Sequence, residues 1–173
     1  QISENIVAQM TTGENTDEVP MVTFVVSRDD NPVSGEEFDY FTDDEEERAS
    51  LSRQLEEDIN NLPEYVTLNA IGILKVESAN ILIPVWDEAT VISLRYGGGH
   101  YETSVMPGEV GNCTVLAHHM RAEDSMFHNL DMVTYGDIIE FTTITGDMYQ
   151  YEVDEIKVIH AYELDDNIRG DIT

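Results

Sequence analysis

Three side chains within one short stretch of the sequence are of types that can perform covalent catalysis. Cys113 is the only cysteine among the 173 residues, and His118 and His119 follow it in the stretch GNCTVLAHHMRAEDSMF. A thiol beside an imidazole is the arrangement of a cysteine nucleophile with its general base, and it requires a separation of about 3 Å. The elements that carry these residues decide whether they can meet.

Cys113 belongs to an apolar β run, CTVLA, that ends at the histidines. Side chains alternate between the two faces of a strand, which rises roughly 3.3 Å per residue. Cys113 and His118 are five residues apart, so they point to opposite faces and lie roughly 17 Å apart. His119 shares a face with Cys113 but lies further away. Unless the segment folds back sharply, Cys113 is a small buried hydrophobic residue and not the partner of either histidine.

The two histidines end this strand and run into a charged loop, RAEDS, which places an imidazole at the rim of a β structure. Such rims carry chemistry because a rigid scaffold fixes the side chain where substrate can reach it. Taken alone, the residues favour an exposed or structurally hydrogen-bonded histidine. His128 and His160 read as surface residues. His100 follows three glycines and is expected to make structural hydrogen bonds in a turn.

The charge of the chain excludes several classes of partner. Eight Lys and Arg stand against 36 Asp and Glu, which gives a net charge of −28. Such a surface repels phosphate backbones, so we expect no nucleic-acid partner. Acidic runs usually form solvated faces, although they could collect Ca²⁺ or cationic peptides. A single cysteine also excludes an internal disulfide framework and any multi-thiolate metal site.

Residues 1–65 differ in texture from the rest and are predicted to form an acidic N-terminal extension. VPMVTFVVSR reads as a strand, and FDYFTDDEEER as an acidic loop. A helix then follows, because four apolar residues at spacings of four, four and three share one helix face. These residues are Leu51, Leu55, Ile59 and Leu62. We expect this amphipathic helix to dock on the main domain.

Residues 66–173 are predicted to be mainly β. Short runs rich in Val, Ile, Thr and Tyr alternate with glycine-bearing turns, which is typical of a sandwich or barrel. The runs are IGILKV, NILIPVW, CTVLA, DIIEFTTIT and MYQYEVDEIKVIHA. The stretch ITGDMYQYEV predicts a hairpin with its tip at residues 145–147.

The order of these pieces resembles the sortases, the cysteine transpeptidases of Gram-positive cell surfaces. The family pattern has a Gly-led strand and a stretch closing on Leu-Pro-Val, here GILKV and ILIPVW. Gly-His-Tyr, a Thr-Ser pair, Pro-Gly and Gly-Asn come next, and MFHNLDMVTYGD matches a later Phe-x-x-Leu … Gly-Asp segment. The matching residues are Gly99 to Tyr101, Thr103, Ser104, Pro107, Gly108, Gly111 and Asn112. The resemblance runs from about residue 71 to about residue 159 and implies a sortase-like closed β-barrel.

The catalytic histidine of the family stands six residues after that asparagine, which is His118 here; a slip of one residue would make it His119. Ala117 occupies the family's glycine position before the histidine, and Glu77 stands where a proline is common. The family's nucleophile lies in a later Thr-Leu-x-Thr-Cys pattern that is not found here, and Arg169 does not match the family arginine. The chain therefore reads as a sortase domain truncated before its catalytic cysteine strand, and it is expected to be inactive alone.

The resemblance implies cleavage of a Leu-Pro-x-Thr-Gly-like sorting signal and transfer of its acyl group to an amine. Implied partners are surface proteins bearing that signal and a cell-wall or pilin amine acceptor. The implied location is the outer face of a Gram-positive cell membrane, with a membrane anchor outside the given chain. The alternative is a catalytically inactive sortase-like barrel that binds peptides or surface proteins.

Two further hypotheses concern the acidic N-terminal region. In some sortases an N-terminal segment covers the groove as a lid held by an acid and an aromatic residue, and Asp39 stands here between Phe38 and Tyr40. The Asp-Pro-aromatic signature of the pilin-polymerising class is absent, so a solvated insertion is favoured. No cofactor is expected. Residues 43–47 could bind Ca²⁺ weakly, although their spacing matches no defined loop site.

Overall fold

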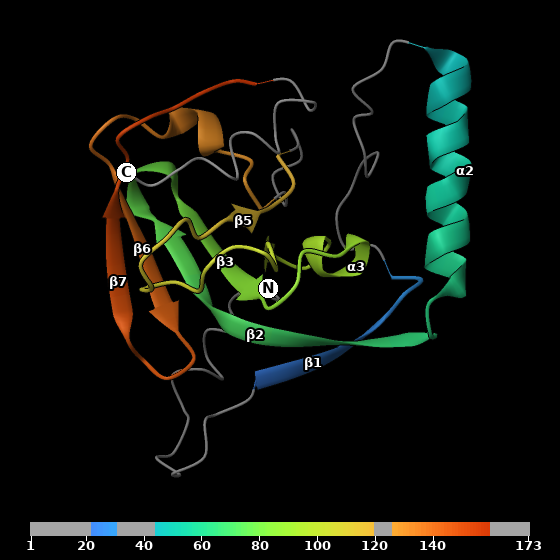
Figure 1. The fold of residues 1–173 in the computed structure, drawn as a ribbon, viewed down its shortest axis with the longest axis horizontal. Coiled ribbons are helices and arrows are strands. Elements are labelled where there is room, and N and C mark those ends of the chain that lie inside the picture. The colour runs from blue at the N-terminus through green and yellow to red at the C-terminus, as the bar shows by residue number, and fades with distance from the viewer. Residues whose placement is uncertain (1–21, 31–43, 120–125, 160–173) are drawn as a thin grey trace.

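The computed structural model describes residues 22–30, 44–119 and 126–159. Its centre is a curled seven-stranded sheet with strand order β5-β4-β3-β2-β6-β7, and β1 pairs with β2 beside this path (Figure 1). The strands are β1 Val22–Ser27, β2 Tyr65–Val76, β3 Ile81–Trp86, β4 Gly98–His100, β5 Val115–Leu116, β6 Ile138–Thr143 and β7 Met148–Glu152. The prediction of a mainly β chain is confirmed.

The sheet is organised around β2. Alternate residues of this strand are buried, from Leu68 to Val76, as period-two packing against one core requires. Its first half pairs with β1, its second half pairs with β6, and β3 runs antiparallel along its other side. A register shift between Ala70 and Gly72 separates the two halves. A Cβ at Gly72 would lie 2.4 Å from the ring of Phe141, so this position needs glycine for the close approach of β6.

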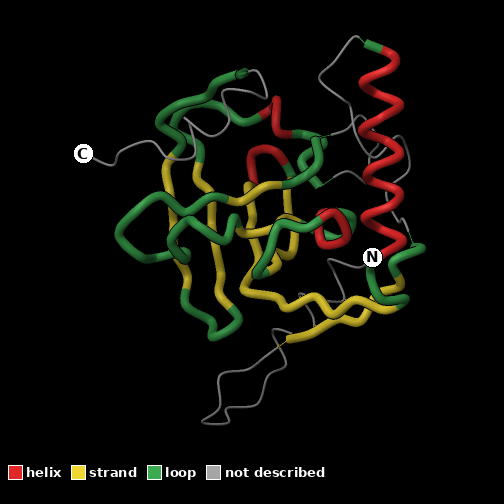
Figure 2. The backbone as a smooth tube through the Cα atoms, turned by 45° about the vertical axis from the view of Figure 1, so that its right-hand side comes forward, coloured by secondary structure: helices red, strands yellow, loops and turns green. Residues whose placement is uncertain are grey.

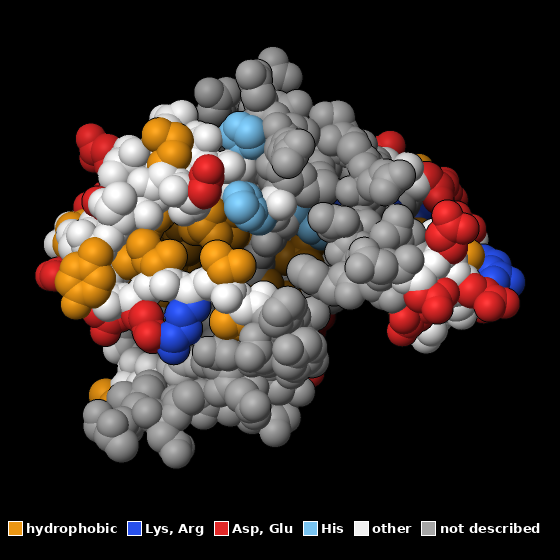
Figure 3. Space-filling model, turned by 90° about the horizontal axis from the view of Figure 1, so that it is seen from above, with side chains coloured by type: hydrophobic (Ala, Val, Ile, Leu, Met, Phe, Trp, Pro, Cys, Tyr) orange, Lys and Arg blue, Asp and Glu red, His pale blue; other side chains and the backbone are white. Residues whose placement is uncertain are grey.

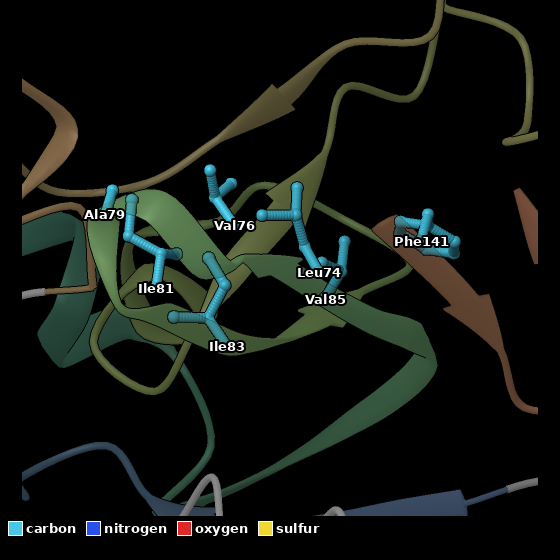
Figure 4. Packing of buried hydrophobic residues seen from close by; sticks show 7 residues of the cluster. All are labelled: Leu74, Val76, Ala79, Ile81, Ile83, Val85 and Phe141. Carbon is cyan, nitrogen blue, oxygen red and sulfur yellow. The ribbon is translucent and has the colours of Figure 1, made fainter. Parts of the chain in front are cut away.

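Two hydrophobic clusters pack against the sheet. The larger joins β2, β3, β6 and the 3-10 helix Glu77–Ala79 (Figure 4). It contains Leu74, Val76, Ala79, Ile81, Ile83, Val85 and Phe141. The second joins β2, β3 and the helix α3 (Val91–Leu94) and contains Leu68, Ala70, Trp86, Ile92 and Tyr96. Phe24 of β1 meets the Trp86 ring edge to face at 5.7 Å, so β1 contributes to this second cluster.

The predicted N-terminal helix is α2, Glu45–Asn61. Asp44 caps it, because its Oδ1 accepts hydrogen bonds from the N–H groups of Glu46 and Glu47. Acidic residues occupy its first turn and no basic residue occupies its last turn. The C-terminal end of α2 is instead stabilised by Arg28, which follows β1. Nη1 of Arg28 donates to the carbonyl of Asn60 at 2.7 Å and to that of Leu62.

The apolar face of α2 is less covered than the sequence pattern predicts. Ile59 packs against the second cluster, whereas the side chains of Leu51 and Leu62 are exposed. The helix rises beside the sheet and does not lie across it (Figure 2). Ile59, near the C-terminal end of α2, is the residue of this face that packs on the described core. A domain boundary at residue 65 stays a prediction, and β1 belongs to the same sheet as β2.

Two predicted strands are shorter than their sequence patterns. Only Val115 and Leu116 of CTVLA form β5, and β7 ends at Glu152. The predicted hairpin is confirmed: β6 and β7 pair antiparallel around a tip that contains Gly146 at φ +90°. Within the described residues the edge strands β5 and β7 do not pair with each other, so the sheet is a half-barrel there. None of the described helices is both long and apolar enough to cross a bilayer.

Candidate functional site

His118 lies two residues beyond the end of β5, where the sequence predicted an imidazole at a strand end. Its ring is half-buried and its Nε2 atom is buried, whereas the neighbouring His119 is exposed. The His118 carbonyl accepts a hydrogen bond from the N–H of Phe127 at 3.0 Å. This bond fixes the backbone of His118 relative to that of Phe127. The face in Figure 3 shows histidine side chains beside a gathering of hydrophobic ones.

Cys113 lies just before β5 and is half-buried. Burial of its thiol raises its pKa, and the nearby carboxylate of Glu109 raises it further. A nucleophilic thiol requires the opposite shift, because the thiolate is the reactive form. The residues after Cys113 run extended, with Val115 opposite His100 and Leu116 opposite Gly99 in β4. This geometry supports the prediction that Cys113 is a packing residue and not a nucleophile.

His100, at the end of β4, makes the structural hydrogen bonds that were expected of it. Its side chain is buried, with 4% of its surface exposed. Its Nε2 lies 3.0 Å from the carbonyl oxygen of Val105 and 3.0 Å from Oγ of Ser104. The Ser104 hydroxyl donates to the carbonyl of Tyr101 and accepts from the N–H of Thr114. These contacts join the two ends of the loop 101–114, which the sequence pattern did not show.

The three glycines before His100 allow β4 to approach its neighbours. A Cβ at Gly97 would lie 2.5 Å from the carbonyl oxygen of Pro84, and one at Gly99 would lie 2.4 Å from Cα of Ala89. Both distances are shorter than contacts that real Cβ atoms make. The sequence marked these glycines as a turn, whereas in the structure Gly98 and Gly99 belong to the closely packed strand β4, which ends at His100.

The loop 101–114 is also fastened from outside, by the β6–β7 hairpin. The N–H of Gly108 donates to the phenol oxygen of Tyr151 at 2.8 Å. Gly108 has φ +87°, and a Cβ there would lie 2.3 Å from the ring of Tyr149. Sequence reasoning identified Pro107 and Gly108 as family motif residues but not this contact. The alternating tyrosines of the predicted hairpin were the signal in the sequence that could have indicated this contact, because large side chains on one face of a hairpin need packing partners.

A second hydrogen-bonded node supports the segment between Phe127 and β6. The Asp137 carboxylate accepts from the Thr134 N–H at 2.7 Å and from the Ser78 hydroxyl at 2.8 Å. The first of these bonds, and then the second, lower the pKa of Asp137, because both stabilise its charged form. Sequence reasoning did not identify this node. It links the 3-10 helix after β2 to the turn that starts β6.

The described residues contain no group of three or more His, Cys, Asp or Glu side chains that could hold a metal ion. Asp44, one of the acids suggested for Ca²⁺, is engaged as the helix cap. Weak Ca²⁺ binding at residues 43–47 stays a prediction. The suggested lid residues Phe38, Asp39 and Tyr40 lie outside the described residues, as do His160 and Arg169.

Comparison with known proteins places this arrangement in a family. The chain is similar to Sortase D of Bacillus subtilis, with 27% identity over 93 residues that cover 54% of this chain and 44% of that protein. It is similar to the structure of Streptococcus agalactiae sortase C1 in complex with MTSET, at 34% identity and a TM-score of 0.51. That match covers 56% of this chain and 52% of that one. A Clostridium perfringens Sortase D5 transpeptidase matches at 30% identity and a TM-score of 0.45, over 66% and 65% of the two chains.

The chain thus spans about half the length of the first relatives that it matches. The family model described as the sortase domain matches residues 74–170, which is more than half of the chain. The matched part includes β2 from Leu74, His100 with the hydrogen bonds described above, β5, His118 and the β6–β7 hairpin. The chain belongs to the sortase family.

Proposed function

We propose that this chain is part of a cysteine transpeptidase that cleaves a Leu-Pro-x-Thr-Gly-like sorting signal and passes its acyl group to an amine. The observation that carries the proposal is the position of His118, half-buried at the end of β5 within the matched sortase domain. A rigid strand end holds the ring, and its half-buried position keeps part of the side chain at the surface.

His118 is proposed as the general acid and base. A thiolate attacks the threonine carbonyl, and the amide bond to glycine breaks as the imidazolium of His118 gives its proton to the leaving amine. The thioester that results is attacked by the incoming amine, which loses a proton to His118 as the thiolate leaves. The imidazolium is restored, so the charges and protons balance over one turnover.

The attacking thiol of this reaction is proposed to be a cysteine other than Cys113. The raised pKa of Cys113 keeps it as the unreactive thiol near neutral pH. Because the sequence contains no second cysteine, the proposed nucleophile belongs to a segment outside these 173 residues. The chain by itself is then expected to bind a sorting signal without cleaving it.

The proposed location is the outer surface of a Gram-positive cell, where surface proteins carry the sorting signal and a cell-wall or pilin group supplies the amine. The net charge of −28 argues against nucleic-acid partners. We propose that the membrane anchor lies in sequence outside this chain. Neither a metal nor an organic cofactor is needed for the steps above.

The test uses the full-length protein with a fluorescent sorting-signal peptide and an amine acceptor. We expect transpeptidation in the wild type, its loss in His118→Ala, and its retention in His119→Ala and Cys113→Ala. Loss in His119→Ala with retention in His118→Ala would move the acid–base role to His119. Binding of the peptide without cleavage by the wild type would instead support the inactive, peptide-binding barrel.

A further inference from the structure

His100 stands at a junction that controls how β5 begins. Its backbone is the Cα partner of Val115, the first residue of β5, and its side chain is buried beneath the loop 101–114. Its Nε2 contacts two groups of that loop, Ser104 Oγ and the Val105 carbonyl, each at 3.0 Å. His100 thus pairs with β5 through its backbone and contacts the loop through its side chain. One residue therefore links the loop to the start of β5.

The hydrogen bonds around Ser104 determine where the His100 proton must be. The Val105 carbonyl can only accept, so a hydrogen bond to it requires a proton on Nε2. The Ser104 hydroxyl proton is directed to the Tyr101 carbonyl at 2.7 Å, which leaves the Ser104 oxygen to accept. A single Nε2–H shared between Val105 and Ser104 satisfies both contacts. A lone pair on Nε2 would face the Val105 carbonyl and repel it.

The same Ser104 oxygen accepts the N–H of Thr114 at 3.0 Å, and the Tyr101 N–H donates to the Thr114 carbonyl at 2.9 Å. Both backbone groups of the residue before β5 are therefore held by this cluster. The cluster comprises His100, Tyr101, Ser104, Val105 and Thr114. From Thr114 the chain runs through two strand residues and Ala117 to His118. A displacement of Thr114 would be passed along this short extended segment to the His118 ring.

We propose that His100 is a positioning residue for His118: its Nε2–H, through Ser104 and Val105, fixes the start of β5 and with it the placement of the His118 ring. The effect on turnover rests on the function proposed above, whereas the effect on structure does not. His100 touches no reacting group in this scheme. It acts through the backbone of Thr114.

The experiment compares His100→Gln with His100→Leu in the full-length protein. Glutamine offers an amide N–H at about the reach of Nε2, whereas leucine keeps the bulk and removes the donor. Nitrogen-15 NMR of the wild type is expected to show the His100 proton on Nε2. Hydrogen exchange at the Thr114 amide is expected to quicken at least tenfold in His100→Leu and to stay near the wild-type rate in His100→Gln. Of these two variants, His100→Leu alone should move the His118 ring resonances.

In transpeptidation, His100→Leu is expected to lower kcat roughly ten- to a hundredfold with KM nearly unchanged, because a small misplacement of a catalytic group slows the chemical step. His100→Gln should restore most of this loss. Ser104→Ala tests the same cluster with a smaller change, with Ser50→Ala on the exposed face of α2 as its matched control. It should quicken Thr114 exchange, and Ser50→Ala should not.

A proton on Nδ1 alone would overturn the proposal, as would wild-type exchange at Thr114 and unmoved His118 resonances in both His100→Leu and Ser104→Ala. If the leucine variant fails to fold, the Ser104→Ala result decides. If the wild type performs no transpeptidation, the proposed function fails, and the NMR and exchange results still decide whether His100 positions His118.

Discussion

The N–H of Gly108 donates a hydrogen bond of 2.8 Å to the phenol oxygen of Tyr151, a residue 43 positions later in the chain. The ring of Tyr149 lies against the same glycine. The loop that leads into β5 is therefore held between two supports, the buried His100 cluster on the inside and the β6–β7 hairpin on the outside. A loop held on both sides can place the strand that follows it, and that strand leads to His118.

Gly108→Ala is expected to destabilise the protein more than Gly136→Ala. The two glycines have nearly equal dihedrals, φ +87° and +86°, so both substitutions incur the same left-handed strain of about 1–2 kcal/mol. At Gly108 the new Cβ would lie 2.3 Å from the ring of Tyr149, whereas no described residue lies within 4 Å of a Cβ at Gly136. We expect a further loss of about 1–3 kcal/mol in the free energy of unfolding, measured by urea denaturation. Equal losses of unfolding free energy in the two variants would show that the Tyr149 ring moves aside at no cost.

Tyr151→Phe is expected to remove the acceptor of the Gly108 N–H and little else. The loss of one such hydrogen bond lowers the free energy of unfolding by about 0.5–1.5 kcal/mol. Tyr135→Phe, at a tyrosine that is 73% exposed, is the matched control and should change stability little. Exchange of the Gly108 amide proton, followed by NMR, should quicken in the first variant alone. No change in that exchange would mean that the bond contributes nothing to holding the loop.

Cys113 is expected to react slowly with thiol reagents near neutral pH. Burial and the Glu109 carboxylate raise its pKa above the ordinary value of 9.0, so its thiolate fraction at pH 7.5 is smaller than that of an unperturbed cysteine. The rate of iodoacetamide labelling should rise with pH and reach half its maximum above pH 9.0. Glutathione under the same conditions is the reference. Labelling faster than glutathione at pH 7 would identify an activated thiol.

Asp137 is expected to titrate below its ordinary value of 3.8 because the Thr134 N–H, first, and the Ser78 hydroxyl stabilise its carboxylate. Its contribution to stability is therefore complete above the unfolded pKa and is lost as the pH falls through the lower folded pKa. Ser78→Ala removes one donor and should move the NMR titration of Asp137 upward. An unchanged titration in that variant would show that the Ser78 contact does not stabilise the charge.

Arg28→Ala is expected to loosen the C-terminal end of α2, because Arg28 donates to the last carbonyls of that helix. Amide exchange near Ile59 should quicken, while exchange in the first turn, which Asp44 caps, should stay as it is. Arg53→Ala is the control, since Arg53 donates to the Ala49 carbonyl within its own helix. Equal effects of the two variants would contradict a capping role for Arg28.

The elements that the sequence predicted well are those whose signals are local. The β-branched run IGILKV identified the second half of β2, and Gly146 between two β runs identified the β6–β7 hairpin. The order of short motifs placed a histidine at the end of β5, where His118 is found. Each of these predictions depends on neighbours in the chain, so one sequence was sufficient.

The features that the sequence did not reveal depend on partners far apart in the chain. Nothing near Gly108 indicates that it lies under Tyr149, and nothing near His100 states which hydroxyl it meets. The strand around Val115 is shorter than its pattern, and the Thr114 backbone before it bonds to the Tyr101 N–H and to Ser104 Oγ. The apolar face of α2 predicted that this helix docks on the main domain. The spacing of apolar residues shows which face is apolar, but not how much of that face other residues bury. Local propensity cannot specify such pairings.

Ser27 pairs with Tyr65, and the Arg28 N–H then donates to the Glu64 carbonyl. These contacts hold the two ends of the connection between β1 and β2 side by side, and we call them the neck of that connection. Nη1 of Arg95 strengthens this neck by donating to the Arg28 carbonyl at 2.6 Å. What emerges from such a neck behaves as a cassette, since lengthening a connection adds only about 0.6 kcal/mol per doubling. An engineer who exchanges it for a reporter or an affinity peptide has to keep Ile59, which packs on the second cluster, if the sheet is to stay undisturbed.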